Sequence, residues 1–222
     1  HELRSPLTTF RLYSEMLAED MVPDAAQRKT YLRTLCEEST RLAHLVENVL
    51  SFSRIERGRA PARLTAIPVG TLLTGLTPRL LARAEQAALA LNITALESTL
   101  QSSVTANATA IEQVLFNLVD NACKYAAHDS QPPRLDLIVA IDSGSVLFTL
   151  RDHGPGLSMA QRRKLFLPFS KSATEAAHSA PGVGLGLALS RRLAREMGGE
   201  LSYAPVEGRG AAFSLRLNLA EG

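Results

Sequence analysis

His1 and Glu2, the first two residues of the chain, have side chains suited to phosphoryl transfer. A neutral imidazole has one nitrogen without a proton and can attack phosphorus, and a neighbouring carboxylate can take the proton that leaves. Ser5 stands where the zinc-binding H-E-x-x-H motif needs a second histidine, so that motif is absent. The pair favours a nucleophile over a metal site, and the alternative is an ordinary surface histidine.

A second group of polar residues, Asn117, Asn121 and Lys124, recurs at spacings of four and three residues. In a helix this spacing puts the two amides and the ammonium on one face. Buried amides are costly without partners, and a hydrated Mg²⁺ with phosphate oxygens would satisfy all three groups. The alternative is a polar helix face that binds no ligand.

The segment from Asp152 to Gly156 reads Asp-His-Gly-Pro-Gly and directly follows a predicted strand. Gly154 and Gly156 allow close backbone approach, and a carboxylate at a pocket floor can accept a hydrogen bond from an exocyclic amine. Adenine carries such an amine where guanine carries a carbonyl, so Asp152 would select adenine. By itself this pattern occurs in many turns.

A further glycine-bearing segment, Gly182 to Leu187, precedes a predicted helix whose first N–H groups can bind phosphate. Leu187 stands where a dinucleotide-binding fingerprint needs its last glycine. The chain also contains no G-x-x-x-x-G-K-[ST] and no G-x-S-x-G sequence. These absences disfavour the dinucleotide-binding, P-loop and α/β-hydrolase classes.

The first 58 residues contain a single glycine and predict two amphipathic helices that meet near Pro23 and Asp24. Apolar residues at alternating spacings of three and four form one stripe on each helix. Two helices alone would leave half of each apolar face in water, so we expect a second hairpin to complete a four-helix bundle. The alternative is that the hairpin packs on the rest of the same chain. The stripes consist of Leu3, Leu7, Phe10, Leu17 and Met21, and of Leu35, Leu42, Leu45, Val49 and Phe52.

Residues 57–61 mix Gly, Pro and positive charge and predict a linker, which we place at 59–63. Beyond it short strands alternate with helices, so the predicted fold class is α+β. Residues 152–184 are rich in Gly, Pro, Ser and charge and predict a long functional loop. The predicted strands are 88–96, 102–106, 135–141 and 146–150, the predicted helices are 110–126 and 185–197, and a last hairpin is predicted around 207–210.

The composition argues against a protein that grips nucleic acid, because 24 Lys and Arg side chains nearly balance 22 Asp and Glu side chains. No stretch approaches the roughly 20 apolar residues that cross a bilayer. The chain begins with His, and we expect it to be part of a longer protein in which any membrane anchor lies outside this sequence. Cys36 and Cys123 lie far apart and are expected to be small buried thiols in a reducing compartment.

Taken in order, these segments resemble the sensor histidine kinases of two-component signalling, and the resemblance covers nearly the whole chain. Residues 1–7 resemble the H box, 117–125 the N box, 152–156 the G1 box, 165–169 the F box and 182–186 the G2 box of that family. The resemblance implies a HisKA-type helical dimerisation and phosphotransfer domain at 1–58. It also implies an α/β-sandwich ATP-binding domain of the Bergerat type at 64–222.

The activity implied by the resemblance is transfer of the γ-phosphate of ATP to His1, with Mg²⁺, followed by transfer to an Asp of a response regulator's receiver domain. Glu2 would be the acid/base partner of His1. The implied assembly is a homodimer through the hairpin, and the implied location of the kinase core is the cytoplasm, with any inner-membrane anchor in regions absent from this chain. No nucleic-acid partner is expected.

The resemblance also assigns roles at the nucleotide. Asn121 would coordinate Mg²⁺ with Asn117 assisting, Lys124 would contact phosphate, Tyr125 would cover the adenine and Asp152 would bind its amino group. Residues 158–181 would form the lid over ATP, with Lys171 near the terminal phosphate. The full implied set is Asn117, Asn121, Lys124, Tyr125, Asp152, Gly154, Gly156, Phe169, Lys171, Gly182, Gly184, Leu185 and Gly186.

Three positions depart from the family pattern. Ser5 stands where many relatives have Thr or Asn to orient water for dephosphorylating the partner, which leaves phosphatase activity open. Asn107 replaces a common Asp before the N-box helix, and both residues cap helices well. Leu167 replaces the usual Glu of the F box and puts one lid contact in question.

Two other functions remain open at this point. One is a related ATPase or chaperone-type machine with the same nucleotide pocket, and the other is a nucleotide-binding scaffold that has lost phosphotransfer. The adjacent His1 and Glu2 argue against both.

Overall fold

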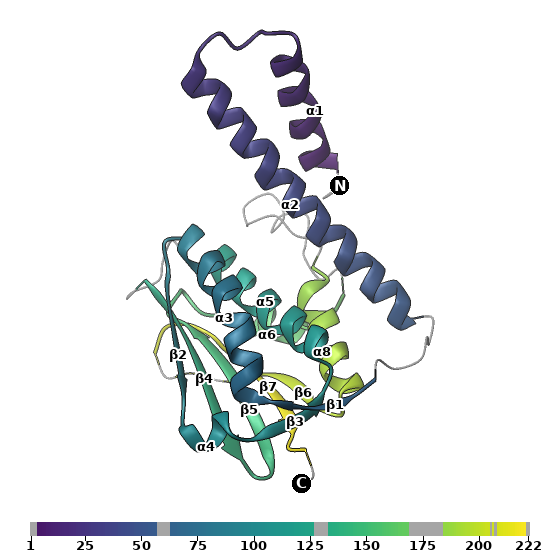
Figure 1. Ribbon diagram of the computed structural model, residues 1–222, viewed down its shortest axis with the longest axis vertical. Coiled ribbons are helices and arrows are strands. Elements are labelled where there is room, and N and C mark those ends of the chain that lie inside the picture. Colours follow the sequence, from purple (N-terminus) through teal and green to yellow (C-terminus); the bar gives the residue numbers. More distant parts are fainter. Residues whose placement is uncertain are drawn as a thin grey trace.

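A helical hairpin and an α/β domain follow one another along the chain (Figure 1). The computed structural model describes residues 4–56, 63–126, 133–168, 184–204, 206 and 208–220. None of the helices in these ranges combines the length and the apolar character that crossing a membrane requires.

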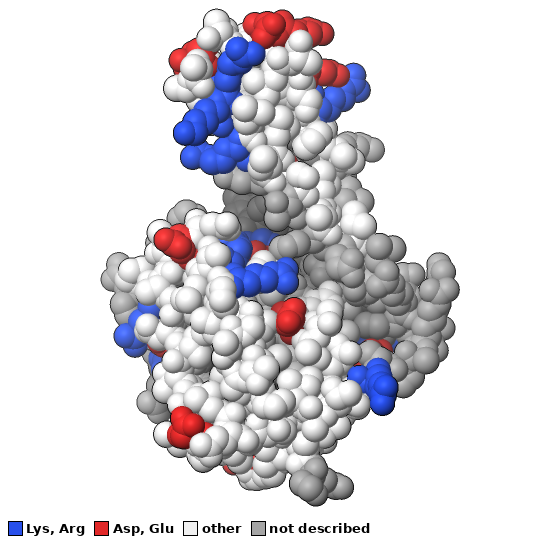
Figure 2. Space-filling view, viewed as in Figure 1, with Lys and Arg blue, Asp and Glu red and all other residues white. Residues whose placement is uncertain are grey.

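The hairpin consists of α1 (Arg4–Ala18) and α2 (Ala25–Glu56), which confirms the two predicted helices. Asp24 caps α2, because its carboxylate accepts hydrogen bonds from the N–H groups of Ala26 and Gln27 at 3.3 and 3.1 Å. The rings of Tyr13 and Tyr31 stack with centroids 4.2 Å apart and join the two helices. Figure 2 shows acidic side chains gathered at the end of the hairpin where the helices connect.

The apolar stripe of α1 stays largely uncovered within a single chain. Leu7, Phe10 and Met21 are 54%, 37% and 60% exposed. The rest of the described chain therefore does not cover this part of the stripe, and the alternative in which the hairpin packs on its own chain is not met at these three positions.

A mixed five-stranded sheet forms the second domain, with strands in the order β2-β4-β5-β7-β6. Only β2 and β4 pair in parallel; the other pairs are antiparallel. The turn between β4 and β5 has Ser143 and Gly144 at φ of 50° and 77°, the conformation that a two-residue hairpin turn requires. The strands are β2 (Ala90–Ala95), β4 (Arg134–Asp142), β5 (Ser145–Asp152), β6 (Glu200–Ala204) and β7 (Ala212–Asn218).

Three helices, α3 (Val69–Gln86), α5 (Ala108–Tyr125) and α8 (Gly186–Glu196), pack on one face of this sheet (Figure 1). Alternate residues of β5 point to that face, where Val146, Phe148 and Leu150 are buried. Asp152 continues this alternation and lies on the helix-covered face at the end of the strand. Beside the large sheet, β1 (Thr65–Pro68) and β3 (Ser103–Ala106) form a two-stranded one, and the short α4 (Glu97–Leu100) connects β2 to β3. The predicted α+β class is confirmed.

The structure contains elements that were not expected from the sequence: β1, the short α4 and two longer helices. No helix was expected over Val69–Gln86, where Gly70, Gly75 and Pro78 interrupt an otherwise periodic apolar pattern. Residues 152–184 were expected to be loop, but α6 (Met159–Lys164) lies within them. Ser158 and Gln161 form a capping box at its start, with the Gln161 N–H donating to the Ser158 hydroxyl at 3.3 Å.

Candidate nucleotide-binding site

Asn117 lies where α5 packs against α8 and is buried. Its amide nitrogen donates a hydrogen bond at 3.2 Å to the hydroxyl of Ser190, a fully buried residue of α8. A Cβ added at Gly186 would lie 3.9 Å from the Asn117 side chain, so the first turn of α8 approaches this amide closely. Ser190 was not among the predicted site residues; the contact spans 73 positions of the chain.

Asn107, one of the three positions that depart from the family pattern, fixes the start of α5. Asn107 caps the helix, because its side-chain oxygen accepts a hydrogen bond from the Ala110 N–H at 2.9 Å. The expectation that Asn107 would serve as a cap is therefore confirmed. From this fixed start, Asn117, Asn121 and Lys124 follow on one side of the helix, and Asn121 and Lys124 are partly exposed.

Asp152 is buried at the end of β5, and its Oδ1 accepts hydrogen bonds from the N–H groups of Gly154 and Ala211 at 3.0 and 3.2 Å. Burial raises the pKa of Asp152, although these two backbone bonds act to lower it. Both recorded bonds fall on one oxygen. The predicted role of Asp152, a bond to the adenine amine, would therefore fall to the other oxygen, Oδ2.

Three glycines bring the backbone close to this carboxylate. A Cβ at Gly154 would lie 2.6 Å from the Cβ of Ala126, so only glycine lets the end of α5 pack on the loop after β5. Gly156, at φ of 80°, packs against Gly210, and a Cβ at Gly210 would meet the carbonyl oxygen of Asp152. The G1-box segment therefore packs against Ala126, the residue that directly follows the predicted N-box segment.

The segment before α8 completes the described part of the site. Gly184 has a φ of 72°, a left-handed conformation that glycine adopts at no steric cost. Leu185 is buried and precedes Gly186, the first residue of α8. Gly184, Leu185 and Gly186 thus lie at the start of α8, as the sequence predicted, and Gly186 approaches Asn117.

Some predicted residues lie outside the described ranges or are described only in part. His1, Glu2, Phe169, Lys171 and Gly182 fall outside them. Ser5 lies in the first turn of α1, and only its backbone is described. The Tyr125 side chain is 44% exposed at the end of α5.

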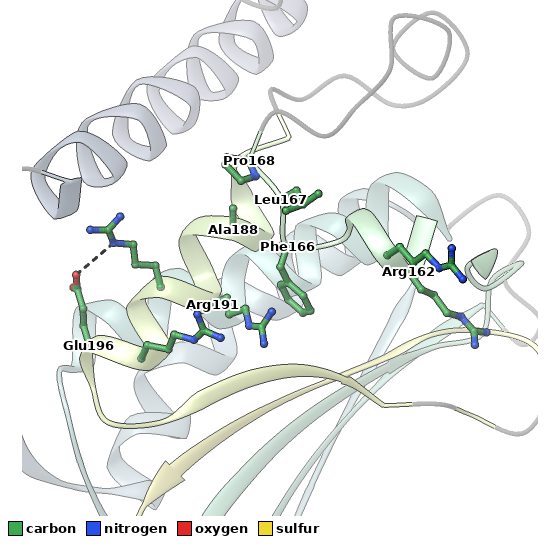
Figure 3. A pocket seen from close by; sticks show the side chains of 10 residues that line it. Arg162, Phe166, Leu167, Pro168, Ala188, Arg191 and Glu196 are labelled. Atoms are coloured by element: carbon green, nitrogen blue, oxygen red, sulfur yellow. Dashed lines mark ion pairs between the residues drawn. The ribbon is translucent and has the colours of Figure 1, made fainter. Parts of the chain in front are cut away.

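On the outer face of α8 lies a separate, strongly basic groove of about 900 Å³ (Figure 3). Its lining from α8 includes Arg191, Arg192 and Arg195, on the side of the helix opposite to the buried Ser190. Figure 3 shows Phe166 next to Arg191, whose guanidinium lies 4.7 Å from the ring centroid. Leu167, which departs from the F-box pattern, also lines this groove.

The two cysteines divide in their exposure. Cys123 is buried, as expected, and burial raises the pKa of its thiol to about 11. Cys36 is exposed on α2, so the expectation that both thiols are buried is wrong at this position. Leu35 and Leu42 of the apolar stripe on α2 are also only partly buried within one chain.

Two family models match the chain in sequence. The model described as His Kinase A (phospho-acceptor) domain matches residues 1–58. The model described as histidine kinase-, DNA gyrase B-, and HSP90-like ATPase matches residues 106–221, just over half of the chain.

Curated relatives align along nearly all of this chain. The sensor histidine kinase MtrB of Mycobacterium tuberculosis (strain CDC 1551 / Oshkosh) is 32% identical over 225 residues, covering 100% of this chain and 38% of MtrB. The aerobic respiration control sensor protein ArcB of Escherichia coli (strain K12) is 28% identical over 222 residues, covering 98% of this chain and 27% of ArcB. The chain thus spans well under half the length of these relatives.

Solved structures share the arrangement of both parts. The Acinetobacter baumannii histidine kinase AdeS superposes with a TM-score of 0.70 at 23% identity, over 100% of this chain and 98% of that one. Full-length ShkA in complex with AMPPNP superposes with a TM-score of 0.66 at 28% identity, over 100% of this chain and 45% of that one.

Proposed function

This chain belongs to the sensor histidine kinase family, and on that premise we propose that it transfers the γ-phosphate of ATP to its own His1 and then to an aspartate of a response regulator. In the first step a nitrogen of the His1 imidazole attacks the γ-phosphorus, an N–P bond forms and the bond to the leaving ADP oxygen breaks. Glu2 takes the proton from the imidazole. In the second step the carboxylate of the receiver aspartate attacks the same phosphorus and His1 leaves.

The observation that carries the proposal is the buried Asp152 with both backbone hydrogen bonds on Oδ1. Those bonds fix the carboxylate plane, so Oδ2 is held ready to accept from the adenine amine. Guanine would present a carbonyl oxygen to the same carboxylate, and two acceptors repel. The pocket is therefore proposed to bind ATP in preference to GTP, with Tyr125 covering the adenine.

The phosphates are proposed to lie along α5, near the start of α8. Asn121 would hold Mg²⁺ with Asn117 assisting, and an amide oxygen at each position suits that ion's preference for oxygen ligands. Bound Mg²⁺ supplies charge neutralisation at the phosphate oxygens. Lys124 and Lys171 would add positive charge at the phosphates, and Phe169 is proposed to belong to the nucleotide-binding set.

The domain division supports a reaction between two parts of the chain. We assign residues 1–58 to dimerisation and phosphotransfer, 59–63 to a linker and 64–222 to ATP binding and catalysis. The exposed Leu7, Phe10 and Met21 of α1 offer an apolar face to a second hairpin, so a homodimer built on a four-helix bundle is the proposed assembly.

The proposed place of action is the cytoplasm, where ATP and the response regulator are available, with any membrane anchor in regions outside this sequence. The Ser5 hydroxyl is proposed to orient water for dephosphorylation of the receiver domain, a weaker activity than kinase action. Neither an ATPase nor a scaffold accounts for a histidine nucleophile followed in sequence by a carboxylate at His1 and Glu2.

One experiment separates the kinase from an ATPase of the same fold. The chain is incubated with γ-labelled ATP, and both protein-bound label and free phosphate are measured over time. Label that is labile in acid and stable in base supports phosphohistidine. We expect no steady hydrolysis, because the amide of Asn117 cannot accept a proton from water at neutral pH. Steady release of phosphate at turnovers per minute, with no such label on the protein, would favour the ATPase.

A further inference from the structure

Asp120 of α5 forms ion pairs with two cations from different directions. Its Oδ1 pairs with the Nε of Arg83 on α3 at 2.9 Å, and its Oδ2 pairs with the Nζ of Lys124, one turn further along α5. The three side chains are 21%, 18% and 29% exposed, in the order Arg83, Asp120 and Lys124. Each carboxylate oxygen thus serves a different cation in a largely desolvated setting.

The carboxylate stays ionised at neutral pH. Burial acts to raise the pKa of Asp120, but the charges of Lys124 and Arg83 and their hydrogen bonds outweigh it and lower the pKa. Two cations and one carboxylate leave a single positive charge on the group. Asp120 therefore neutralises half of the positive charge that Arg83 and Lys124 bring to this side of α5.

The position of this ion pair on the helix matters for Lys124. Asn117, Asn121 and Lys124 share one face of α5, and Asp120 lies at its edge next to α3. The pair with Asp120 draws the ammonium toward that edge. An ammonium that contacts a phosphate oxygen has to exchange part of this ion pair for the new contact.

We propose that Asp120 is a positioning residue that sets how readily Lys124 reaches the nucleotide phosphates, and that Arg83 tunes Asp120 by sharing its negative charge. The proposal rests on the proposed function, in which Lys124 contacts phosphate. With Arg83 present, the carboxylate divides its attraction between two cations. Without Arg83, Lys124 is its only described counterion and is held more tightly.

The two substitutions have opposite expected effects on ATP affinity, measured by calorimetry on the full chain. Asp120→Asn releases Lys124 and strengthens binding, and Arg83→Gln strengthens the hold on Lys124 and weakens binding, each by about two- to fivefold. Damage to the fold would weaken binding in both variants. If Asp120→Asn weakens ATP binding, the proposal is overturned.

Two controls separate this route from a general change in charge. Arg79 lies one turn before Arg83 on α3, with its guanidinium 4.3 Å from the ring centroid of Phe116, so Arg79→Gln removes the same charge from the same helix. It should change affinity less than Arg83→Gln does. In a Lys124→Gln background, Asp120→Asn should no longer strengthen binding. An equal effect of the two arginine substitutions, or a gain that persists without Lys124, contradicts the proposal.

A measurement without nucleotide keeps this proposal distinct from the proposed function. The acetylation rate of Lys124 by acetic anhydride is followed by mass spectrometry on the same variants. Because the ion pair holds the Lys124 ammonium against Asp120 and away from the reagent, Asp120→Asn should speed labelling, Arg83→Gln should slow it and Arg79→Gln should leave it unchanged. Unchanged labelling in all three variants would refute the control of Lys124 by Asp120, whereas absence of ATP binding by the unmodified chain would refute only the proposed function.

Discussion

Replacing Asp152 with Asn tests the link between the buried carboxylate and the adenine amine. The two side chains have nearly the same shape, so the amide oxygen of the variant can keep the bonds from Gly154 and Ala211 that Asp152 Oδ1 accepts at 3.0 and 3.2 Å. The amide nitrogen then takes the place of Oδ2. At that place a donor faces the adenine amine, which is also a donor, and the charge-assisted bond is lost.

The expected loss follows from the strength of such a bond. A hydrogen bond to a charged group contributes about 1–3 kcal/mol, which corresponds to a decrease of roughly 5- to 150-fold in ATP affinity. Titration calorimetry on the full chain measures this change, with GTP as the comparison ligand. The unmodified chain should prefer ATP, and Asp152→Asn should lose most of that preference.

The stability of the nucleotide-free protein should move in the other direction. Burial raises the pKa of Asp152 above 3.8, so its contribution to stability is present below that value and is lost as pH rises through the folded-state pKa. At pH 7 the ionised carboxylate disfavours the folded state, and Asp152→Asn removes this penalty. The melting temperature of the variant should therefore be at least as high as that of the unmodified chain at pH 7. Unchanged ATP affinity, or a variant that melts several degrees lower, would refute this account of Asp152.

Two further predictions concern the hairpin and the thiols. Leu7→Asp and Phe10→Asp each put a charge on the exposed stripe of α1, so each should weaken dimerisation about tenfold or more in light scattering. The control Leu12→Asp, at an exposed position off the stripe, should not weaken it. A stable monomer of the unmodified chain at micromolar concentration would contradict the bundle. In the native protein at pH 8 a thiol reagent should modify the exposed Cys36 quickly and leave Cys123 unmodified, because burial raises the pKa of Cys123 to about 11. Rapid reaction of both thiols would contradict the burial of Cys123.

Regular periodicity made much of the fold predictable. The heptad spacing over residues 3–52 predicted α1 and α2. Two short strand-type segments on either side of a turn with Ser143 and Gly144 predicted β4 and β5. The helical pattern of α3 has equally regular buried residues, but two glycines and Pro78 lower the helix propensity of this segment. Tertiary packing overrides that propensity, because the apolar face of α3 is buried against the core.

The candidate site was predictable where one short segment supplies the chemistry. Asp152, Gly154 and Gly156 lie within five residues, and the structure brings them together at the end of β5. The partners from elsewhere in the chain were not predictable. Arg83 reaches Asp120 from a helix that was itself missed, and Ser190 meets Asn117 across 73 positions. Such contacts depend on the packing of α3, α5 and α8, which spacing within one segment does not specify.

The central claim is that His1 receives the γ-phosphate of ATP, and the most direct measurement compares the chain with its His1→Gln variant. Both are incubated with γ-labelled ATP and Mg²⁺, and protein-bound label is quantified before and after acid treatment, with ATP affinity measured in parallel. The unmodified chain should carry label that acid removes and base does not. His1→Gln should carry no label and should bind ATP with nearly unchanged affinity, since the residues proposed to bind ATP lie in the other proposed domain. Acid-labile label that persists in His1→Gln would contradict the claim.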